Sequence, residues 1–502
     1  MAMFKHVGGF RTLTALALIF GTSPAMAATI TVEGSCGLAN AIEAANSDAP
    51  VGGCVAGAGA DTIVLPEDAT FTLTDAAIDF EGPTGLPLVT STVTIEGNGS
   101  VIERDPEADR FRILATSYAD LTLRDLTIAG GNVRTDGGGI FNDGGDLTLE
   151  RCVITDNEAT TGGGISNYWG YFEMHDTLVV GNRSSNFGGG VESIGAFLIS
   201  RSTFLDNDGG NWGGGLEFFT FGYEALITDS TFSGNVAALN GGGISQAAES
   251  AVVLVSTTIT GNIAGSEGGG IYSAGYPVTL SRSVISGNEA PAGREAALSD
   301  FSDSSEFTLF GHDGDSGLAF FTPSPTDIIP SESLAQILDP VPRDNGGHTH
   351  THMLPLGSPA LDVTGSVCTP TDQHGVTRPQ GAACDLGAVE RVVDPCPNAA
   401  PSSGCTVNGV SNQLCRGTSA NDVIVGTAGA DVILGLGGND TIQGGRGNDV
   451  LCGGTGNDDV RGQVGNDNVF GNGGSDTLFG GLGADGLDGG PGVDSCTRDE
   501  AD

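Results

Sequence analysis

The sequence predicts an all-β chain in which a right-handed parallel β-helix is followed by a parallel β-roll. The first observation is a repeat of 25–28 residues that becomes explicit from residue 121 and continues to about 290. The second is a repeat of nine residues across 417–497. Units of such lengths cannot bury an apolar face alone, so successive units must stack as coils. The 83 glycines among 502 residues suit a chain with many tight turns.

The first 27 residues are typical of a secretory signal peptide. Lys5 and Arg11 form a basic start, residues 13–20 are apolar, and 25–27 read Ala-Met-Ala, so we expect cleavage before Ala28. The alternative is an uncleaved membrane anchor, but the apolar run is shorter than the roughly 20 residues that a spanning helix needs. No later segment has that length, and we expect a secreted protein that is extracellular or held at the cell surface.

Ten cysteines are then in an oxidising compartment and can form disulfides. Cys36 with Cys54 and Cys368 with Cys384 are the expected pairs, because each pair brackets one short segment. The partners of the others stay open: Cys152, Cys396, Cys405, Cys415, Cys452 and Cys496.

Residues 28–60 are predicted to form an N-terminal cap. A short strand at 29–32 precedes Leu38, Ile42 and Ala45, which have helical spacing. A helix there would cover the open edge of the first coil. The segment resembles the CSLREAI motif at the start of some secreted β-helix proteins, although the Arg-Glu of that motif is replaced near Asn40-Ala41. The matching residues are Cys36, Leu38, Ala41 and Ile42.

Residues 61–340 are predicted to form the β-helix. From 121 on, each unit contains a Gly-Gly-Gly triplet, an apolar residue directly after it, and an Asn that recurs at nearly the same phase. We expect the Asn side chains to form an internal ladder from coil to coil; simple turn residues are the alternative. The column consists of Asn132, Asn157, Asn182, Asn207, Asn235, Asn262 and Asn288. Beyond 290 the period is lost, with strands expected at 307–310 and 318–321.

Residues 341–390 differ in composition and are predicted to be a closing module. The run 371–388 resembles the signature of the choice-of-anchor Q domain and departs from it at His374 and Leu386. That resemblance implies a family of secreted β-helix proteins and says little about activity. Residues 391–416, rich in Pro, Ser and Cys, are predicted to be a linker.

The repeat at 417–497 has the form G-G-x-G-x-D-x-U-x, where U is apolar. Glycine permits positive φ and lets carbonyl groups point inward, while each Asp adds a carboxylate at the end of a turn. Two rows make one coil, so Asp side chains of alternate rows stack, and such hard oxygen ligands select Ca²⁺. The predicted metal ligands are Asp422, Asp431, Asp440, Asp449, Asp458, Asp467, Asp476, Asp485 and Asp494.

This repeat resembles the RTX, or hemolysin-type, calcium-binding repeat, and the resemblance implies a parallel β-roll with several Ca²⁺ ions between successive turns. The alternative is an acidic glycine-rich linker, but a linker needs no apolar residue at a fixed phase. Residues 417–502 hold 14 acidic and three basic side chains. Their repulsion should oppose folding until Ca²⁺ binds.

The net charge of −43 argues against nucleic acid or an anionic membrane as a partner. Calcium is the expected cofactor, and extracellular polysaccharide or a cell surface is the candidate partner. His348, His350 and His352 would share one face of a strand and could there bind Zn²⁺ or Cu²⁺. No Cys or carboxylate obviously converges on them, so solvated histidines are the preferred interpretation.

Glu192 and Glu217 are weak candidates for catalysis. If Val191 and Leu216 point inward, both carboxylates point outward on neighbouring coils, about 5 Å apart. Aromatic residues such as Trp169 lie nearby in sequence, and this spacing suits a retaining glycosidase. Stacked like charges also raise a carboxyl pKa. Solvated or Ca²⁺-bridged carboxylates are the preferred alternative, and no Arg or Lys is placed to act as a lyase base.

The sequence thus favours a secreted calcium-binding protein with a structural or adhesive role over an enzyme. The alternative is a calcium-dependent glycosidase, lyase or epimerase that acts on polysaccharide. The architecture is similar to that of alginate C5-epimerases, which carry a Tyr/Asp/His cluster. Here His175 is the lone histidine of residues 61–290, and no Asp-Pro-His-Glu-like run accompanies it. An RTX toxin is set aside because no pore-forming apolar helix is present.

Overall fold

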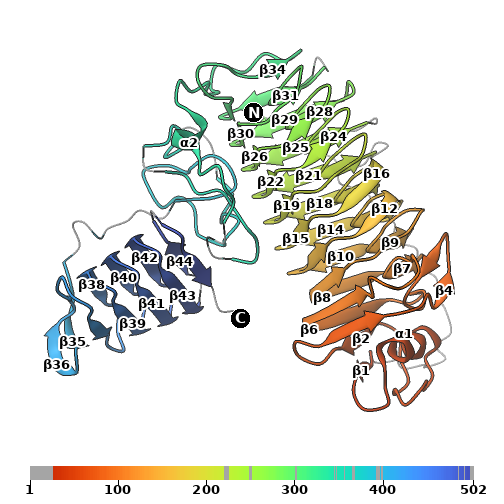
Figure 1. Cartoon of the computed structure of the whole chain (residues 1–502), viewed down its shortest axis with the longest axis horizontal. Helices are drawn as coiled ribbons and strands as arrows, with labels where there is room; N and C mark the ends of the chain where they lie inside the picture. Colours follow the sequence, from red (N-terminus) through yellow and green to blue (C-terminus); the bar gives the residue numbers. More distant parts are fainter. Residues whose placement is uncertain are drawn as a thin grey trace, which may run out of the picture.

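The computed structural model describes residues 27–497 except 220–224, 248–250, 300–301, 344, 346, 356, 364–367, 392–395, 397–399, 484 and 491. Apart from Ala27, the predicted signal peptide lies outside the described residues. Among the residues described, no helix is both long enough and apolar enough to cross a membrane. The predicted fold class is confirmed, with a parallel β-helix followed by a β-roll (Figure 1).

The first coil is covered by the helix α1 (Leu38–Ser47), as its apolar spacing predicts (Figure 1). Leu38, Ile42 and Ala45 are buried, and the helix ends at Asp48 in the left-handed conformation. The predicted disulfide between Cys36 and Cys54 ties the start of α1 to the loop that follows it. The apolar end of the strand stack is thereby closed to a further chain.

The β-helix has three columns of strands, and all pairings between successive coils are parallel. The first column contains β1 (Thr29–Thr31), β2 (Asp61–Val64), β6 (Val93–Arg104), β8 (Leu121–Ala129), β10 (Leu147–Glu150), β14 (Phe172–His175), β18 (Phe197–Ser200), β21 (Ala225–Thr228), β25 (Val252–Val255), β29 (Val278–Ser281) and β32 (Ser304–Glu306). The second contains β3 (Thr70–Leu73), the later halves of β6 and β8, β11 (Val153–Thr155), β15 (Leu178–Val180), β19 (Thr203–Leu205), β22 (Thr231–Ser233), β26 (Thr258–Thr260), β30 (Val284–Ile285) and β33 (Leu309–Phe310).

In each coil a turn leads from the second-column strand to a strand of the third column. It contains β7 (Leu114–Ser117), β9 (Ile140–Asp143), β13 (Ile165–Tyr168), β17 (Val191–Ile194), β20 (Leu216–Phe218), β24 (Ile244–Gln246), β28 (Ile271–Ser273), β31 (Ala296–Ala297) and β34 (Leu318–Ala319). Short pairs form at other turns: β4 (Ile78–Asp79) with β5 (Pro83–Thr84), β12 (Glu158–Thr161) with β16 (Arg183–Phe187), and β23 (Val236–Ala237) with β27 (Ile263–Ala264).

The glycine triplets form the tight corners that lead into the third column. Gly162 opens its triplet at φ +60°, and a Cβ on Gly163 would collide with the carbonyl oxygen of Gly189 on the next coil. The apolar residue after each triplet points inward as predicted and is at most 1% exposed. These residues are Ile140, Ile165, Val191, Leu216, Ile244 and Ile271.

Six of the seven predicted Asn residues form the internal ladder. Each Nδ2 donates to the Oδ1 of the next, at 2.8–3.0 Å, from Asn157 through Asn288, and the last Nδ2 donates to Glu295 Oε2 at 2.7 Å. The prediction for Asn132 is wrong. Gly131 occupies the ladder position, its amide donating to Asn157 Oδ1, whereas the Asn132 side chain donates to Glu158 at the surface.

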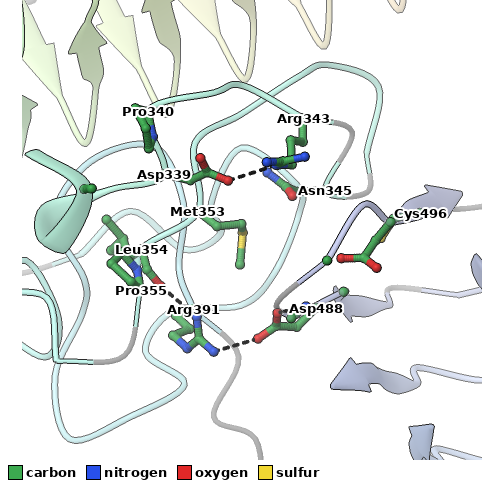
Figure 2. A pocket seen from close by; sticks show the side chains of 15 residues that line it. Asp339, Pro340, Arg343, Asn345, Met353, Leu354, Pro355, Arg391, Asp488 and Cys496 are labelled. Carbon is green, nitrogen blue, oxygen red and sulfur yellow. Dashed lines mark hydrogen bonds and ion pairs between the residues drawn. The ribbon is translucent and has the colours of Figure 1, made fainter. Parts of the chain in front are cut away.

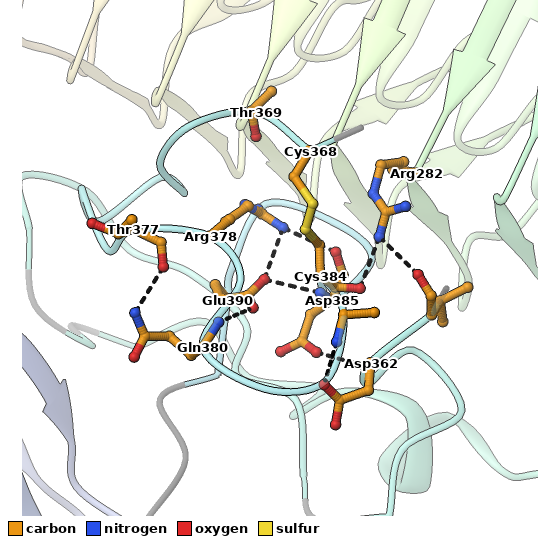
Figure 3. Close-up of a disulfide and its surroundings, with 12 residues drawn as sticks. Arg282, Asp362, Cys368, Thr369, Thr377, Arg378, Gln380, Cys384, Asp385 and Glu390 are labelled. Atoms are coloured by element: carbon orange, nitrogen blue, oxygen red, sulfur yellow. Dashed lines mark hydrogen bonds and ion pairs between the residues drawn. A yellow bond between two sulfur atoms is a disulfide. The ribbon is translucent and has the colours of Figure 1, made fainter. Parts of the chain in front are cut away.

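The predicted closing module lies along the side of the β-helix, between it and the roll (Figure 1). It covers second-column strands: Gln373 exchanges side-chain hydrogen bonds of 2.7 Å with Thr203 and Thr231. The second predicted disulfide, Cys368–Cys384, lies beside a buried ionic cluster (Figure 3). There Arg378, with a fully buried side chain, contacts Glu390 at 3.4 Å and Asp229 at 3.5 Å. A short helix, α2 (Leu334–Ile337), precedes the module.

The expectation for the three histidines is wrong in its geometry. Their segment is not a strand, and the three residues differ in burial: His348 is exposed, His350 is half-buried and His352 is buried. His352 is 2% exposed and hydrogen-bonds to the Asp339 carbonyl oxygen at 2.6 Å and to Ser233 Oγ at 2.9 Å. Burial lowers the pKa of His352 to about 4. This histidine joins the module to the β-helix.

The predicted linker is partly folded. β35 (Ser403–Val407) and β36 (Val410–Leu414) form an antiparallel hairpin that contains the Cys405–Cys415 disulfide. β35 also pairs with the first strand of the roll, and Cys396 is bonded to Cys452 within the roll. The hairpin therefore covers the open N-terminal edge of the roll, as α1 covers that of the β-helix.

The roll consists of two parallel sheets whose strands alternate along the chain (Figure 1). One sheet contains β37 (Val423–Val425), β39 (Thr441–Arg446), β41 (Asp459–Val464), β43 (Thr477–Leu482) and β45 (Ser495–Thr497). The other contains β38 (Val432–Gly437), β40 (Val450–Thr455), β42 (Asn468–Gly473) and β44 (Gly486–Asp488). The apolar column from Ile424 to Cys496 lies between them, at most 3% exposed, and provides one buried side chain per row.

Candidate functional site

The Asp side chains of the roll stack on alternate rows, as the spacing predicts. The backbone amide of each Asp donates to Oδ1 of the Asp 18 residues later, at 2.7–2.8 Å, from the pair Asp422–Asp440 to the pair Asp476–Asp494. Eight of the nine are at most 4% exposed, and Asp494 in the last row is partly exposed. From Asp440 on, one oxygen of each carboxylate thus has a structural role, and Oδ2 is the oxygen that a ligand can use.

The second oxygen, Oδ2, faces backbone carbonyls. A Cβ on Gly453 would lie 2.5 Å from Asp458 Oδ2 and 2.8 Å from the Gly471 carbonyl oxygen, so only glycine leaves this space open. The same surroundings recur in five successive rows, and there Oδ2 is buried without a hydrogen-bond partner. These five residues are Asp440, Asp449, Asp458, Asp467 and Asp476.

The first two rows differ from these five. Asp422 Oδ2 accepts hydrogen bonds from the amide and hydroxyl of Thr418, at 2.6 and 2.9 Å, and Asp431 does the same with Thr427. Burial acts to raise the pKa of Asp422, but the bonds from Thr418 and Asn408 outweigh it and lower that pKa. The nine predicted ligands are therefore not equivalent.

A bound cation would stabilise the buried carboxylates of these five rows. Burial, and then neighbouring Asp residues, raise the pKa of Asp440, Asp449 and Asp476 to about 6 and that of Asp467 to about 7. Arg461 does not neutralise these carboxylates, because it pairs with Asp459 at 2.8 Å on the outer face. Buried oxygen atoms of carboxylates and carbonyls, without nearby positive charge, fit the hard cation Ca²⁺.

Comparison with known proteins agrees with this geometry. The family model of the RTX calcium-binding nonapeptide repeat matches residues 416–451, 453–487 and 461–496. The chain carries RTX calcium-binding repeats. A second model, the Chlamydia polymorphic membrane protein repeat, matches 229–246 and 256–274 in the β-helix. No curated protein matches the chain.

Two solved structures are similar to the chain at low identity. Pectate lyase Pel9A is 13% identical over 66% of this chain and 88% of its own, with a TM-score of 0.44. The PL6 family alginate lyase AlyGC is 10% identical over 85% of this chain and 68% of its own, with a TM-score of 0.24.

The last coil of the RTX repeats lies against the closing module (Figure 2). A cavity of about 470 Å³ separates them, and Arg391 crosses it to contact Asp488 at 3.0 Å. Asn345 forms a β-bridge with Cys496 of the final strand. Arg343, paired with Asp339 at 2.9 Å, acts to lower the pKa of Asp494, which burial raises. Here guanidinium groups lie beside the carboxylates of the last described coil.

The β-helix carboxylates lie where predicted along the chain but not in solvent. Glu192 and Glu217 are cross-strand neighbours, yet they are only 4% and 0% exposed, so the expectation of solvated carboxylates is wrong. Aromatic residues on both sides enclose this face, including the Phe187–Phe219 contact at 6.0 Å. Ser166 Oγ donates to Glu192 Oε2 at 2.7 Å, and burial raises the pKa of Glu192 to about 7.

Glu192 opens into a pocket of about 250 Å³, which we call the carboxylate pocket. Glu217 is not part of its lining. Asp136, which is not among the residues predicted from sequence, lies before a glycine triplet and brings a second carboxylate to the pocket. Burial raises the pKa of Asp136. The lining residues are Asp136, Thr161, Tyr168, Phe187, Glu192, Ile194 and Phe219.

The buried carboxylate of Glu217 lowers the free energy of unfolding of the β-helix. Burial raises its pKa well above the usual range; Ser245 offsets a part of this, but neither carboxylate oxygen has a hydrogen bond of good geometry. Glu217→Met should stabilise the β-helix by about 1–3 kcal/mol at pH 8. Because the pKa of Glu217 is raised in the folded state, wild-type stability falls as the pH rises above the pKa of the unfolded chain, which is about 4.3. The stability difference between Glu217→Met and the wild type should therefore vanish near pH 4.

Thermal unfolding of both proteins at pH 4 and pH 8 measures this difference. Glu158→Met, at an exposed position, is the matched control and should change stability by less than about 0.5 kcal/mol at either pH. If Glu217→Met is less stable than the wild type at pH 8, the Glu217 carboxylate has stabilising interactions in its buried position.

Proposed function

We propose that this chain is a secreted calcium-binding protein with a structural or adhesive role at or near the cell surface. The observation that carries the proposal is the run of five buried Oδ2 atoms without partners, each facing glycine carbonyls. Four disulfides and a start typical of a signal peptide support export. Outside cells Ca²⁺ is abundant, so the ion acts as a folding trigger rather than a signal.

In this proposal Asp440, Asp449, Asp458, Asp467 and Asp476 hold Ca²⁺ together with glycine carbonyls of their own and the next coil. The bound ion supplies positive charge to a stack that has none. Asp Oδ1 keeps each coil in register through its amide bond, and glycine keeps the space open. Asp422 and Asp431 are weaker ligands, because Ca²⁺ must compete there with Thr418 and Thr427. Asp485 and Asp494 lack a described following coil.

Calorimetric titration of residues 28–502 with Ca²⁺ and with Mg²⁺ tests the proposal. We expect several ions to bind, with Ca²⁺ preferred because Mg²⁺ demands stricter octahedral geometry. Asp458→Asn removes half the charge of one carboxylate pair and should lower the number of ions bound or weaken their affinity at least tenfold. Asp459→Asn, one residue later on the outer face, is the control and should bind as the wild type does. Equal responses to the two metals would contradict the proposal.

A second candidate function is polysaccharide cleavage, which the carboxylate pocket favours. Glu192, with a pKa near 7, has the protonation that a general acid needs, and Asp136 provides a second carboxylate. Incubating residues 28–502 with acidic and neutral polysaccharides and measuring reducing ends tests this. Product from the wild type but not from Glu192→Gln supports an enzyme. Product from neither protein, or from both, removes Glu192 from a catalytic role.

A further inference from the structure

Large aromatic side chains are exposed at one corner of the β-helix, where third-column strands end. Tyr118 is 81% exposed and Trp169 is 56% exposed. The amide of Tyr118 donates to the Asp143 carbonyl and that of Gly144 to the Tyr168 carbonyl, at 2.7 and 2.8 Å. Residues 118, 144 and 169 therefore occupy equivalent positions on successive coils. With coils about 4.8 Å apart, the backbones of residues 118 and 169 are about 10 Å from each other along the axis. The Tyr118 ring extends over Gly144 toward Trp169, because a Cβ on Gly144 would lie 2.8 Å from Tyr118 Cε1.

The aromatic corner, which we define as Tyr118, Tyr168, Trp169 and Tyr171, is continuous with the carboxylate pocket. Tyr168 provides the connection: its ring contacts Trp169 edge-on at 6.5 Å between centroids, and it also lines the pocket beside Glu192. Tyr168 and Tyr171 are 36% and 39% exposed. A ligand lying on the corner can therefore reach the two carboxylates without any rearrangement of the coils.

We propose that the aromatic corner and the carboxylate pocket bind an uncharged polysaccharide chain that lies along the β-helix axis. Tyr and Trp combine a flat apolar ring with a polar tip, which matches the apolar C–H faces and hydroxyl rims of pyranose rings. The Tyr118 ring, which covers Gly144, and the Trp169 ring follow each other along the axis, as the sugars of an extended chain do. The two rings then provide one stacking surface for a chain that runs along the axis.

The pocket has the size and chemistry for a single sugar unit next to that track. Its 250 Å³ lies below the range of about 300–1,000 Å³ for drug-sized ligands. Asp136 and Glu192 provide carboxyl oxygens that accept hydrogen bonds from sugar hydroxyls. The lining contains no Lys or Arg, and the chain has a net charge of −43, so uronate or sulfate groups would be repelled.

The inference rests on the adhesive part of the proposed function and not on calcium binding, so the calcium titration and the glycan test can fail separately. Tyr118 has φ +49° and Trp169 has φ +63°, and Gly144 occupies the position between them. Tyr118→Gly and Trp169→Gly are therefore compatible with the backbone. Phe320→Gly is the matched control, because Phe320 also has φ +63°, is 73% exposed, and lies at the far end of the same column.

Binding is measured by calorimetry and by retardation in gels that contain soluble glucomannan, mixed-linkage β-glucan or polygalacturonate, with residues 28–502 in calcium buffer. We expect the wild type to bind an uncharged glycan, each corner variant to bind at least tenfold more weakly, and the double variant to show no retardation. Phe320→Gly should bind as the wild type does. The proposal is overturned if neither uncharged glycan binds, if all three variants weaken binding equally, or if polygalacturonate binds more tightly.

Discussion

Chelation of calcium is expected to unfold the RTX repeats while the β-helix stays folded. The central apolar column of the roll has one side chain per row, and three rows add a second buried apolar residue (Leu434, Cys452 and Phe470), whereas the carboxylates stack without a basic side chain between them. One ion at 100 times its dissociation constant stabilises the folded form by about 2.7 kcal/mol. Two or three such ions already equal the roughly 5–15 kcal/mol that holds a typical domain together, so metal-free coils have little left to keep them folded.

Differential scanning calorimetry of residues 28–502, with Ca²⁺ and with a chelator, measures this expectation. Two transitions should appear with Ca²⁺, and only that of the β-helix should remain without it, shifted by a few degrees at most. Proteolysis in the chelator should cut within 417–497 first. Both buffers contain no reductant, because the disulfides Cys396–Cys452 and Cys405–Cys415 hold the first coils independently of calcium. A roll transition at the same temperature in both buffers would show that hydrogen bonds alone stabilise it.

The parts of the fold that could be predicted from sequence are those in which one interaction repeats. The apolar column of the roll and the residues after the glycine triplets reappear at a constant phase because each touches its own copy on the next coil. Asn132 shows the limit. It has the right type and nearly the right spacing, but Gly131 occupies the ladder position one residue earlier, and only the hydrogen bonds reveal it.

Features that depend on contacts between different segments could not be predicted. Glu217 looks like a surface residue until aromatic side chains from several coils enclose its face. His352 reads as part of a solvated run, but its ring reaches Ser233, which is 119 residues away in sequence. The bonds from Thr418 to Asp422 distinguish the first row of the roll, although the nonapeptide pattern treats it like the others. In each case the contacting residue lies outside the repeat, or at a position of the repeat where the residue type varies.

Asn207→Ala is expected to destabilise the β-helix by about 2–5 kcal/mol. Its Oδ1 accepts from the amide of Asn182 at 3.0 Å, and its Nδ2 donates to the Val179 carbonyl at 2.9 Å. Both of these backbone groups are buried between coils, where water cannot replace the lost bonds. An unsatisfied buried group costs about 1–3 kcal/mol, and this change leaves two of them. Unfolding of the β-helix by heat or denaturant, with calcium present, measures the loss.

Two further variants separate the hydrogen bonds of the ladder from the volume of the side chain. Asn132→Ala deletes the same atoms outside the ladder and should cost less than about 0.5 kcal/mol, so an equal loss at both sites would contradict a special role for the ladder. Asn207→Asp keeps the volume and the acceptor, but an ionised carboxylate cannot donate to the Val179 carbonyl. It would also place a second acceptor against Asn235 Oδ1, where Asn207 now donates a hydrogen bond of 2.9 Å. Since a buried carboxyl in that position regains a donor only when protonated, Asn207→Asp should approach wild-type stability near pH 4 and lose it as the pH rises toward 8.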